Sequence, residues 1–283
     1  MEEAEAIKEI VKANAMAVYT DAAQPSVRVV GKSLAQCVSL FATPVGRMAE
    51  IFEKNVHRYI DKLDGIQEEN LVSPDTRILV PILEKMRFTD EEKVAEYYAE
   101  ILATASKKEH ANKVLVTFIE ILNRLTADEI KILEYINSPS NNISIPAITE
   151  DESARCGLPA GTTLLNIQGA LPVLEIQRTV EGQEGYRVID KNFTSISDFV
   201  ELSAPNNIDA YIDNMISLGL IEKKPTFRFS IDKVYHSLEN HPNMLVIKTN
   251  IESQEKVKIK LDRGRIDITG LGKKLLALGM GVH

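Results

Sequence analysis

The stretch RFTDEEKVAEYYAEILATAS, from Arg87 to Ser106, constrains the fold of this chain more than any other segment. Thr89 and Glu92 have the spacing of a capping box, in which each side chain bonds the backbone N–H of the other residue. Alanines between the larger residues leave room for a neighbouring helix. The stretch therefore predicts a helix capped at Thr89, with one wide apolar face formed by Val94, Tyr97, Tyr98, Ile101, Leu102 and Ala105.

Further helices are predicted on both sides of this one. SPDTRILVPILEKMRF has Ser73 as its cap and Pro74 at the first helical position. Pro81 should kink or break that helix, because proline lacks a backbone donor and clashes with the preceding turn. Asn112–Leu125 forms another helix, and TADEIKILEYI opens with a second capping box. A heptad-like seam fits packing inside a bundle, which we favour, or against a second subunit: Ala49, Phe52, Val56, Tyr59, Leu63 and Ile66.

The pattern changes after Asn137, where NSPSNN is a turn cluster. Short apolar runs broken by Gly and Pro predict small strands up to Asp190, and a helix follows from Asn206 to a terminating Gly219. KPTFRFSI, NMLVIKTNI and KVKIKLD then indicate a β-hairpin, before a final helix that begins at Asp267 or Thr269. We predict a mainly α fold with an α-helical domain over residues 1–137 and a smaller winged-helix-like α+β domain over residues 138–283.

Charge is unevenly distributed. The segment from Glu222 to the C-terminus has 12 Lys and Arg against 7 Asp and Glu, a balance of +5, whereas the rest has 21 against 34, a balance of −13. A basic hairpin suits a phosphate backbone or an acidic partner. The preceding helix carries Asp209 and Asp213 but no Lys or Arg, which argues against sequence-specific base reading. The candidate contact residues are Lys223, Lys224, Arg228, Lys256, Lys258, Lys260, Arg263 and Arg265.

No motif predicts catalysis, a cofactor or a metal ion. Gly31–Ser33 resembles the end of a phosphate-binding loop, but Ser26 stands where the loop needs glycine. GLGKK, at Gly270–Lys274, lacks the third glycine of a dinucleotide site. The five histidines show no ligand spacing, and Cys37 and Cys156 have no CxxC partner. We expect a protein that is not an enzyme, with free thiols in a reducing cytoplasm.

The beginning of the sequence, MEEAEAIKEI, is acidic and amphipathic, unlike a secretory signal. No run of apolar residues is long enough to span a membrane. The amphipathic segment Ser33–Leu63 leaves a membrane-surface effector as one hypothesis. We rank it last, because its polar face mixes acids with bases.

Several phrases of this sequence resemble the abortive infection alpha family of bacterial proteins. They are LVSPDTRILVPILEKMRF, then TDEEKVAEYYAEILATAS with His110 after it, LTADEIKILEYI, YIDNMISLGLIE and ITGLGKKLLALGM. The resemblance covers most of residues 30–137 and the last 80 residues. It implies a cytoplasmic bacterial protein in defence against bacteriophage, and it implies no catalytic residues. The shared phrases are mostly helix caps and packing stripes.

These observations favour a phage-defence protein that acts by binding a protein partner or a second copy of itself. The first alternative is a nucleic-acid-binding regulator that uses the basic hairpin without sequence specificity. The second alternative is the membrane-surface effector.

Overall fold

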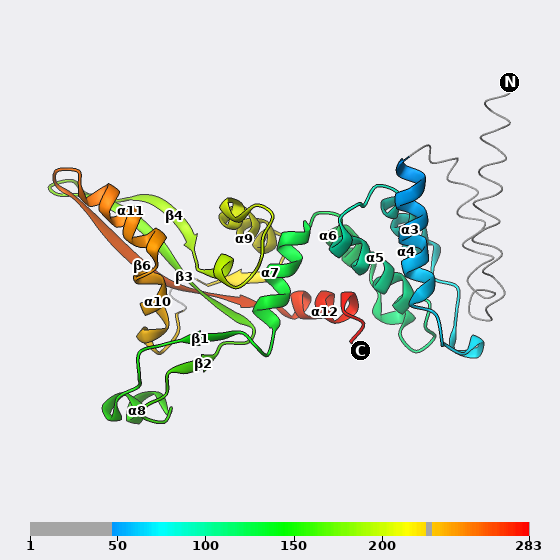
Figure 1. Ribbon diagram of the computed structural model, residues 1–283, viewed down its shortest axis with the longest axis horizontal. Helices are drawn as coiled ribbons and strands as arrows, with labels where there is room; N and C mark the ends of the chain where they lie inside the picture. The colour runs from blue at the N-terminus through cyan, green and yellow to red at the C-terminus, as the bar shows by residue number, and fades with distance from the viewer. Residues whose placement is uncertain (1–46, 225–227, 283) are drawn as a thin grey trace, which may run out of the picture. The chain divides into compact units, whose positions relative to one another are not determined.

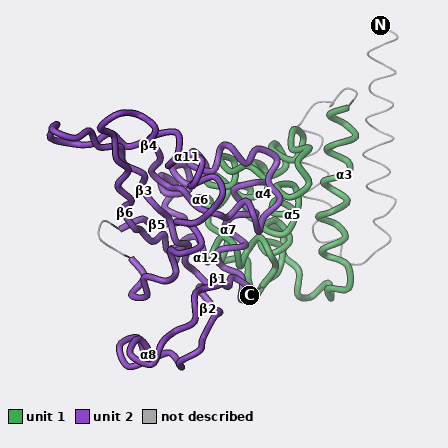
Figure 2. Tube along the Cα trace, turned by 60° about the vertical axis from the view of Figure 1, so that its left-hand side comes forward, with its two compact units in different colours: residues 1–127, 274–283 green, residues 128–273 purple. Residues whose placement is uncertain are grey.

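The computed structural model of the protein describes residues 47–224 and 228–282. Two compact units divide the chain, residues 1–127 with 274–283 and residues 128–273 (Figure 2). Some predictions lie outside the described residues: those for the acidic start, for Gly31–Ser33 and Cys37, and for the first part of Ser33–Leu63. We describe each unit by itself.

Unit 1 is helical. Its helices are α3 (Arg47–Asp61), α4 (Thr76–Met86), α5 (Glu92–Ala105) and α6 (Val116–Leu122), with short 3₁₀ turns at Glu68–Asn70 and Ala111–Lys113. Most of α5 is buried, including the whole predicted apolar face. The alanines of α5 let neighbouring helices approach on more than one side.

Helix α3 packs against α4 and α5 within unit 1. The seam residues Phe52, Val56, Tyr59 and Leu63 are buried, which confirms the intramolecular packing that the sequence favours. A ladder of ion pairs joins α3 and Lys62, directly after it, to α5 and Asp90, just before it. Its members are Arg47–Asp90, Arg58–Glu92 at 2.5 Å, Lys62–Glu96 at 2.5 Å and Lys62–Glu100 at 2.7 Å.

Several predicted helix ends in unit 1 are wrong. Thr89 does not cap α5; its hydroxyl donates to the carbonyl of Lys85, and the buried Asn55 of α3 donates to the carbonyls of Met86 and Thr89. Tertiary contacts with α3 thus replace the local capping box. Helix α4 begins after Asp75, whose carboxylate accepts from the backbone N–H of Arg77, so Ser73 is not the cap.

The other differences in unit 1 concern Pro81 and the helix predicted at Asn112–Leu125. Pro81 lies inside α4, which continues through it to Met86. Regular helix α6 occupies only Val116–Leu122, and Leu115, which precedes it, is 53% exposed.

The last helix, α12 (Gly270–Gly279), has its first four residues in unit 2 and the others in unit 1. Thr269 caps it, because its hydroxyl accepts from the backbone N–H of Gly272 at 3.0 Å. A β-carbon on Gly272 would lie 2.3 Å from the carbonyl oxygen of Leu220. Close packing against Leu220 therefore explains why position 272 of the GLGKK segment is a glycine. In unit 1, Gly279 lies directly against the ring of Tyr97.

Unit 2 mixes helices with two sheets. In chain order it contains α7 (Ala127–Asn137, all but its first residue), β1 (Asn142–Ser144), α8 (Glu150–Cys156), β2 (Leu164–Asn166), β3 (Ala170–Val180), β4 (Arg187–Phe193), α9 (Ile208–Ser217), β5 (Ile221–Lys223), α10 (His236–Glu239), α11 (Pro242–Glu252) and β6 (Val257–Ile268). Strands β1 and β2 form a two-stranded sheet, and the larger sheet has the order β4-β3-β6-β5. All neighbouring strands are antiparallel.

Strands β3 and β6 pair along eleven positions, from Ala170–Asp267 to Val180–Val257, and form the long ribbon in Figure 1. Helix α11 packs against β6. One face of the sheet carries the core of unit 2, where Leu174, Ile176, Val234, Tyr235, Leu238 and Met244 are buried. Side chains of β6 alternate between the two faces of the sheet, because Ile259 and Leu261 pack on this core while Lys258 and Lys260 are exposed.

The β-hairpin predicted from NMLVIKTNI and KVKIKLD does not form. The first of these segments is helix α11, and β6 pairs with β3 and β5 instead. Pro242 at the first helical position and the cap formed by His241 favour this helix over the strand that the β-branched residues suggest. The winged-helix-like order is therefore not confirmed, although helices and small sheets are. Within the described ranges, no helix combines the length and apolarity needed to cross a bilayer.

The unit boundaries also differ from the predicted division at residue 137. Helix α7 contributes to unit 2 from Asp128 onward, and residues 274–283 belong to unit 1. Hydrogen bonds inside unit 2 hold the start of α7. The Asp128 carboxylate accepts from the backbone N–H groups of Ser203 and Ala204 and from the Tyr211 hydroxyl.

Candidate functional site

The eight basic residues predicted as a contact surface do not lie on one hairpin. Five of them belong to β6 or directly precede it, namely Lys256, Lys258, Lys260, Arg263 and Arg265; Lys223 and Lys224 are at the end of β5; and Arg228 is an exposed loop residue. Strand β6 is an inner strand of the sheet. The two faces of β6 therefore separate these residues, since successive side chains of a strand point to opposite sides.

Arg263 and Arg265 lie on the core face. Arg263 pairs with Glu239 at 2.8 Å and with Asp232 at 3.2 Å, and its guanidinium lies 5.5 Å from the ring centroid of Tyr235. Arg265 pairs with Asp267 at 2.6 Å and stacks over Phe229. Both guanidinium groups are held inside unit 2, so they are poor candidates for contact with a partner.

Lys223 lies over the opposite face and crosses the sheet. Its ammonium donates to the carbonyl of Lys191, at 2.5 Å, and to Oδ1 of Asn192, at 3.1 Å. Lys223 is on β5 and Asn192 is on β4, the two edges of the sheet. The side chain passes over Gly264, where a β-carbon would stand 3.4 Å from the Lys223 Cε. The Lys223 side chain thus links the two edge strands, β5 and β4, by hydrogen bonds.

A cluster of polar residues surrounds this ammonium. The buried Asn192 donates to the carboxylates of Asp209, at 2.6 Å, and Asp213, at 3.2 Å. Burial lowers the pKa of Lys223, while the charges of Glu175, Asp209, Asp213 and Asp190 oppose that shift. Asp209 and Asp213, which argue against base reading by their helix, therefore take part in a hydrogen-bond network inside unit 2.

Burial also raises the pKa of Asp190, a change that the backbone N–H of Asn192 opposes and the charge of Asp209 reinforces. Gln177, which is 2% exposed, donates to Glu175 at 2.8 Å, and its own carbonyl oxygen has no hydrogen bond among the described residues. The sequence gives no sign of this cluster, because its members come from four separate elements, β3, β4, α9 and β5.

The remaining predicted residues are exposed. Lys256, Lys258 and Lys260 lie at the start of β6, and the Lys260 ammonium is 5.9 Å from the ring centroid of Tyr186. Lys224 pairs with Glu222 at 2.8 Å. Among the predicted basic residues, the exposed ones are thus these three lysines, which lie near one exposed aromatic ring, together with Lys224 and Arg228.

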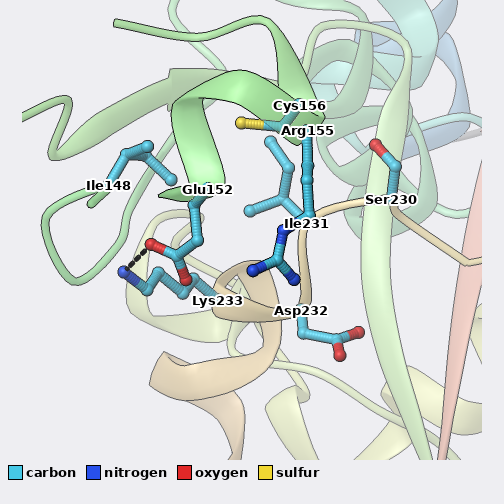
Figure 3. A pocket seen from close by; sticks show the side chains of 8 residues that line it. All are labelled: Ile148, Glu152, Arg155, Cys156, Ser230, Ile231, Asp232 and Lys233. Carbon is cyan, nitrogen blue, oxygen red and sulfur yellow. Dashed lines mark hydrogen bonds and ion pairs between the residues drawn. The ribbon is translucent and has the colours of Figure 1, made fainter. Parts of the chain in front are cut away.

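A pocket of about 180 Å³ lies elsewhere in unit 2, between α8 and the loop Ser230–Lys233 (Figure 3). Ile148, Glu152, Arg155, Cys156, Ser230, Ile231, Asp232 and Lys233 line it. No local sequence pattern reveals this pocket, because its two walls are more than seventy residues apart in the chain. Within the described ranges, no group of His, Cys, Asp and Glu has an arrangement that would hold a metal ion.

Glu152 and Lys233 pair across the pocket at 2.6 Å. The hydrogen bond from Lys233, together with those from the backbone and side chain of Thr149, lowers the pKa of Glu152 to about 2. Lys233 also donates to the carbonyl of Ala147 at 2.5 Å. These contacts use both charged groups for the structure of the pocket wall.

Comparison with curated proteins finds no match to this chain. Among solved structures, an uncharacterized protein from the hydrocarbon-degrading marine bacterium Alcanivorax borkumensis SK2 is 15% identical, with a TM-score of 0.34. The match covers 62% of this chain and 99% of that protein. A TM-score this low does not establish a common fold.

The family comparison is more informative, because one family model covers nearly the whole described part of the chain. The model described as abortive infection alpha matches residues 47–278, from the start of α3 to the last turn of α12. The match includes both units and every predicted basic residue. This chain belongs to the abortive infection alpha family.

Proposed function

We propose that this protein acts in bacterial defence against bacteriophage, in the cytoplasm, by binding rather than by catalysis. The observation that carries this proposal is the family match over residues 47–278, since the family is named for abortive infection. In such a response an infected cell stops producing phage, so the proposed protein must detect infection or block a phage process.

The side chains of unit 2 support binding. The charged side chains of Lys223, Arg263 and Glu152 each bond two or more residues of the same unit, so they serve its structure. Several large apolar side chains are exposed in the same unit, and such residues contribute to protein contacts where they gather; they are Leu164, Tyr186, Ile189, Phe199, Leu245 and Val246. We infer that the bound species is a protein partner or a second copy of this chain. Light scattering on the purified protein tests for the second copy.

Deletion of the gene from its native host tests the defence role. The expected result is a higher plaque count for at least one phage, restored by a plasmid copy. Unchanged counts across a broad phage panel would contradict the proposal.

The alternative is a regulator that binds nucleic acid through Lys256, Lys258 and Lys260, and their exposure beside Tyr186 favours it. Binding of this kind is expected to weaken steeply as salt rises, and to ignore base sequence. Changing the three lysines to Glu should abolish it, whereas changing Lys223 tests nothing because that side chain is internal. Unaltered affinity in the triple variant rules the alternative out.

A further inference from the structure

Arg155 is the uncompensated charge of the pocket described above. Glu152 is paired with Lys233, and Asp232 is paired with Arg263 at 3.2 Å. Arg155, by contrast, takes part in no hydrogen bond or ion pair among the described residues. Its side chain and that of Glu152 run from α8 toward the loop that carries Asp232 (Figure 3). The pocket therefore presents one free cation at its rim.

Beside its charged residues the pocket has an apolar wall, and it is small. Ile148 is 2% exposed and belongs to the core of unit 2, and Ile231 and Cys156 pack against that core. A volume of about 180 Å³ is below the roughly 300–1,000 Å³ of pockets that enclose drug-sized ligands. Nucleotides and dinucleotides are therefore too large. A short hydrocarbon chain that ends in one anionic group matches both the size and the charge.

We propose that this pocket binds a short aliphatic carboxylate. The hydrocarbon part lies against Ile148 and Ile231, and the carboxylate pairs with the guanidinium of Arg155, whose planar fork of donors suits a carboxylate. Ser230, which makes no hydrogen bond through its side chain among the described residues, is a second donor at the rim. The carboxylate belongs either to a free short-chain acid or to the C-terminus of a polypeptide. The inference does not depend on the proposed role in defence.

Titration of the ¹⁵N-labelled full-length protein with sodium butyrate tests the proposal, with sodium chloride at the same ionic strength as the reference. The expected result is saturable shifts of the amides of the pocket residues, with an affinity on the order of millimolar, since one exposed ion pair and a short chain contribute little. Butylammonium, which has the same chain and the opposite charge, should cause no saturable shift there.

Arg155→Gln should weaken butyrate binding by about two- to fivefold, because it removes the exposed ion pair with the carboxylate. Arg187→Gln is the matched control, since Arg187 of β4 is exposed and makes no ion pair within the described ranges. This control should bind like the wild type. Equal affinity in the Arg155→Gln variant, equal binding of butylammonium, or no saturable shift at the pocket would each overturn the proposal.

A short peptide that ends in leucine, and its C-terminal amide, distinguish the two sources of carboxylate. Tighter binding of the free-acid peptide than of butyrate assigns the pocket to a polypeptide C-terminus. Tighter binding of butyrate assigns it to a free acid. If the amide binds as well as the free-acid peptide, the carboxylate is not recognised and the proposal is wrong.

Discussion

The side chain of Lys223 passes over Gly264, and this relationship lets one lysine join both edges of the four-stranded sheet. A β-carbon on Gly264 would stand 3.1 Å from Cγ2 of Val173 and 3.4 Å from Cε of Lys223. A side chain here would crowd Val173 and, if larger than a methyl group, the stem of Lys223, so the glycine of β6 and the lysine of β5 form a structural pair.

Gly264→Val is expected to lower the free energy of unfolding by about 1–3 kcal/mol, the usual cost of overpacking. Gly264→Ala should cost less, because its contacts are tight but involve side-chain atoms. Urea denaturation measures both. Gly270→Ala is the control, since a β-carbon there meets nothing within 4 Å. If Gly264→Val is as stable as the control, Lys223 does not need the path that the structure shows.

Lys223→Met removes two hydrogen bonds and leaves the carboxylates near Asn192 without their cation. We expect a loss of about 1–3 kcal/mol in the free energy of unfolding, the typical effect of unpairing buried polar groups. Lys224→Met, next in sequence but exposed and paired with the half-exposed Glu222, should change stability by less than about 1 kcal/mol. Equal effects of the two substitutions would contradict the structural role of Lys223.

Asp128 holds the loop at Ser203 and Ala204 against α7, and its effect on stability should depend on pH. Burial raises the pKa of its carboxyl group, but the backbone N–H groups of Ser203 and Ala204, the Tyr211 hydroxyl and Lys131 outweigh burial and lower the pKa below its ordinary value of 3.8. A carboxylate with a lowered folded-state pKa stabilises the protein above the ordinary pKa, and that stabilisation is lost as pH falls through the lowered value.

Asp128→Asn should therefore cost about 1–3 kcal/mol at neutral pH, because the amide cannot accept from both N–H groups as the carboxylate does. The difference from the wild type should shrink as the pH falls below about 4. Thermal unfolding from pH 3 to pH 7 measures it, with the exposed Asp61→Asn as the control. A difference that stays constant over this range would show that the ionised carboxylate contributes nothing.

Gly279→Ala should destabilise unit 1. A β-carbon on Gly279 would lie 2.0 Å from Cδ1 of Tyr97, and that ring is 1% exposed and has no space to move away. The expected cost is at least about 1–3 kcal/mol, the range for overpacked cores. Tyr97→Leu combined with Gly279→Ala should recover part of the loss, because the smaller side chain makes room. Without any such recovery, the clash with Tyr97 is not the cause.

How far the sequence predicts the fold depends on whether a feature is local. The buried face of α5, the seam residue Tyr59, the terminating Gly219 with its φ of 71° and the cap at Thr269 all follow from spacing along a single helix or turn. Thr89 shows the limit of such reasoning. Its capping box is correct in spacing, yet Asn55, thirty-four residues earlier, bonds its carbonyl and the chain takes another path.

The features of the candidate site are the least predictable ones. The pairing of β3 with β6 joins residues such as Val173 and Gly264, so no local pattern reveals it. Proximity in sequence therefore groups the basic residues together, whereas the sheet places Arg263 on the core face and Lys223 in an internal network. The pocket depends on the same kind of long-range contact, between Glu152 and Lys233.

The efficiency of plating on a phage-sensitive host that expresses this protein tests the central claim most directly. A panel of unrelated phages is plated on cells with the wild-type gene and on cells with an empty vector, and the full-length protein is detected in the cells. The account predicts at least a tenfold drop in plaques for one or more phages, with infected cells dying before they release a full burst. Equal plating of every phage in the panel, with the protein present and folded, would contradict it.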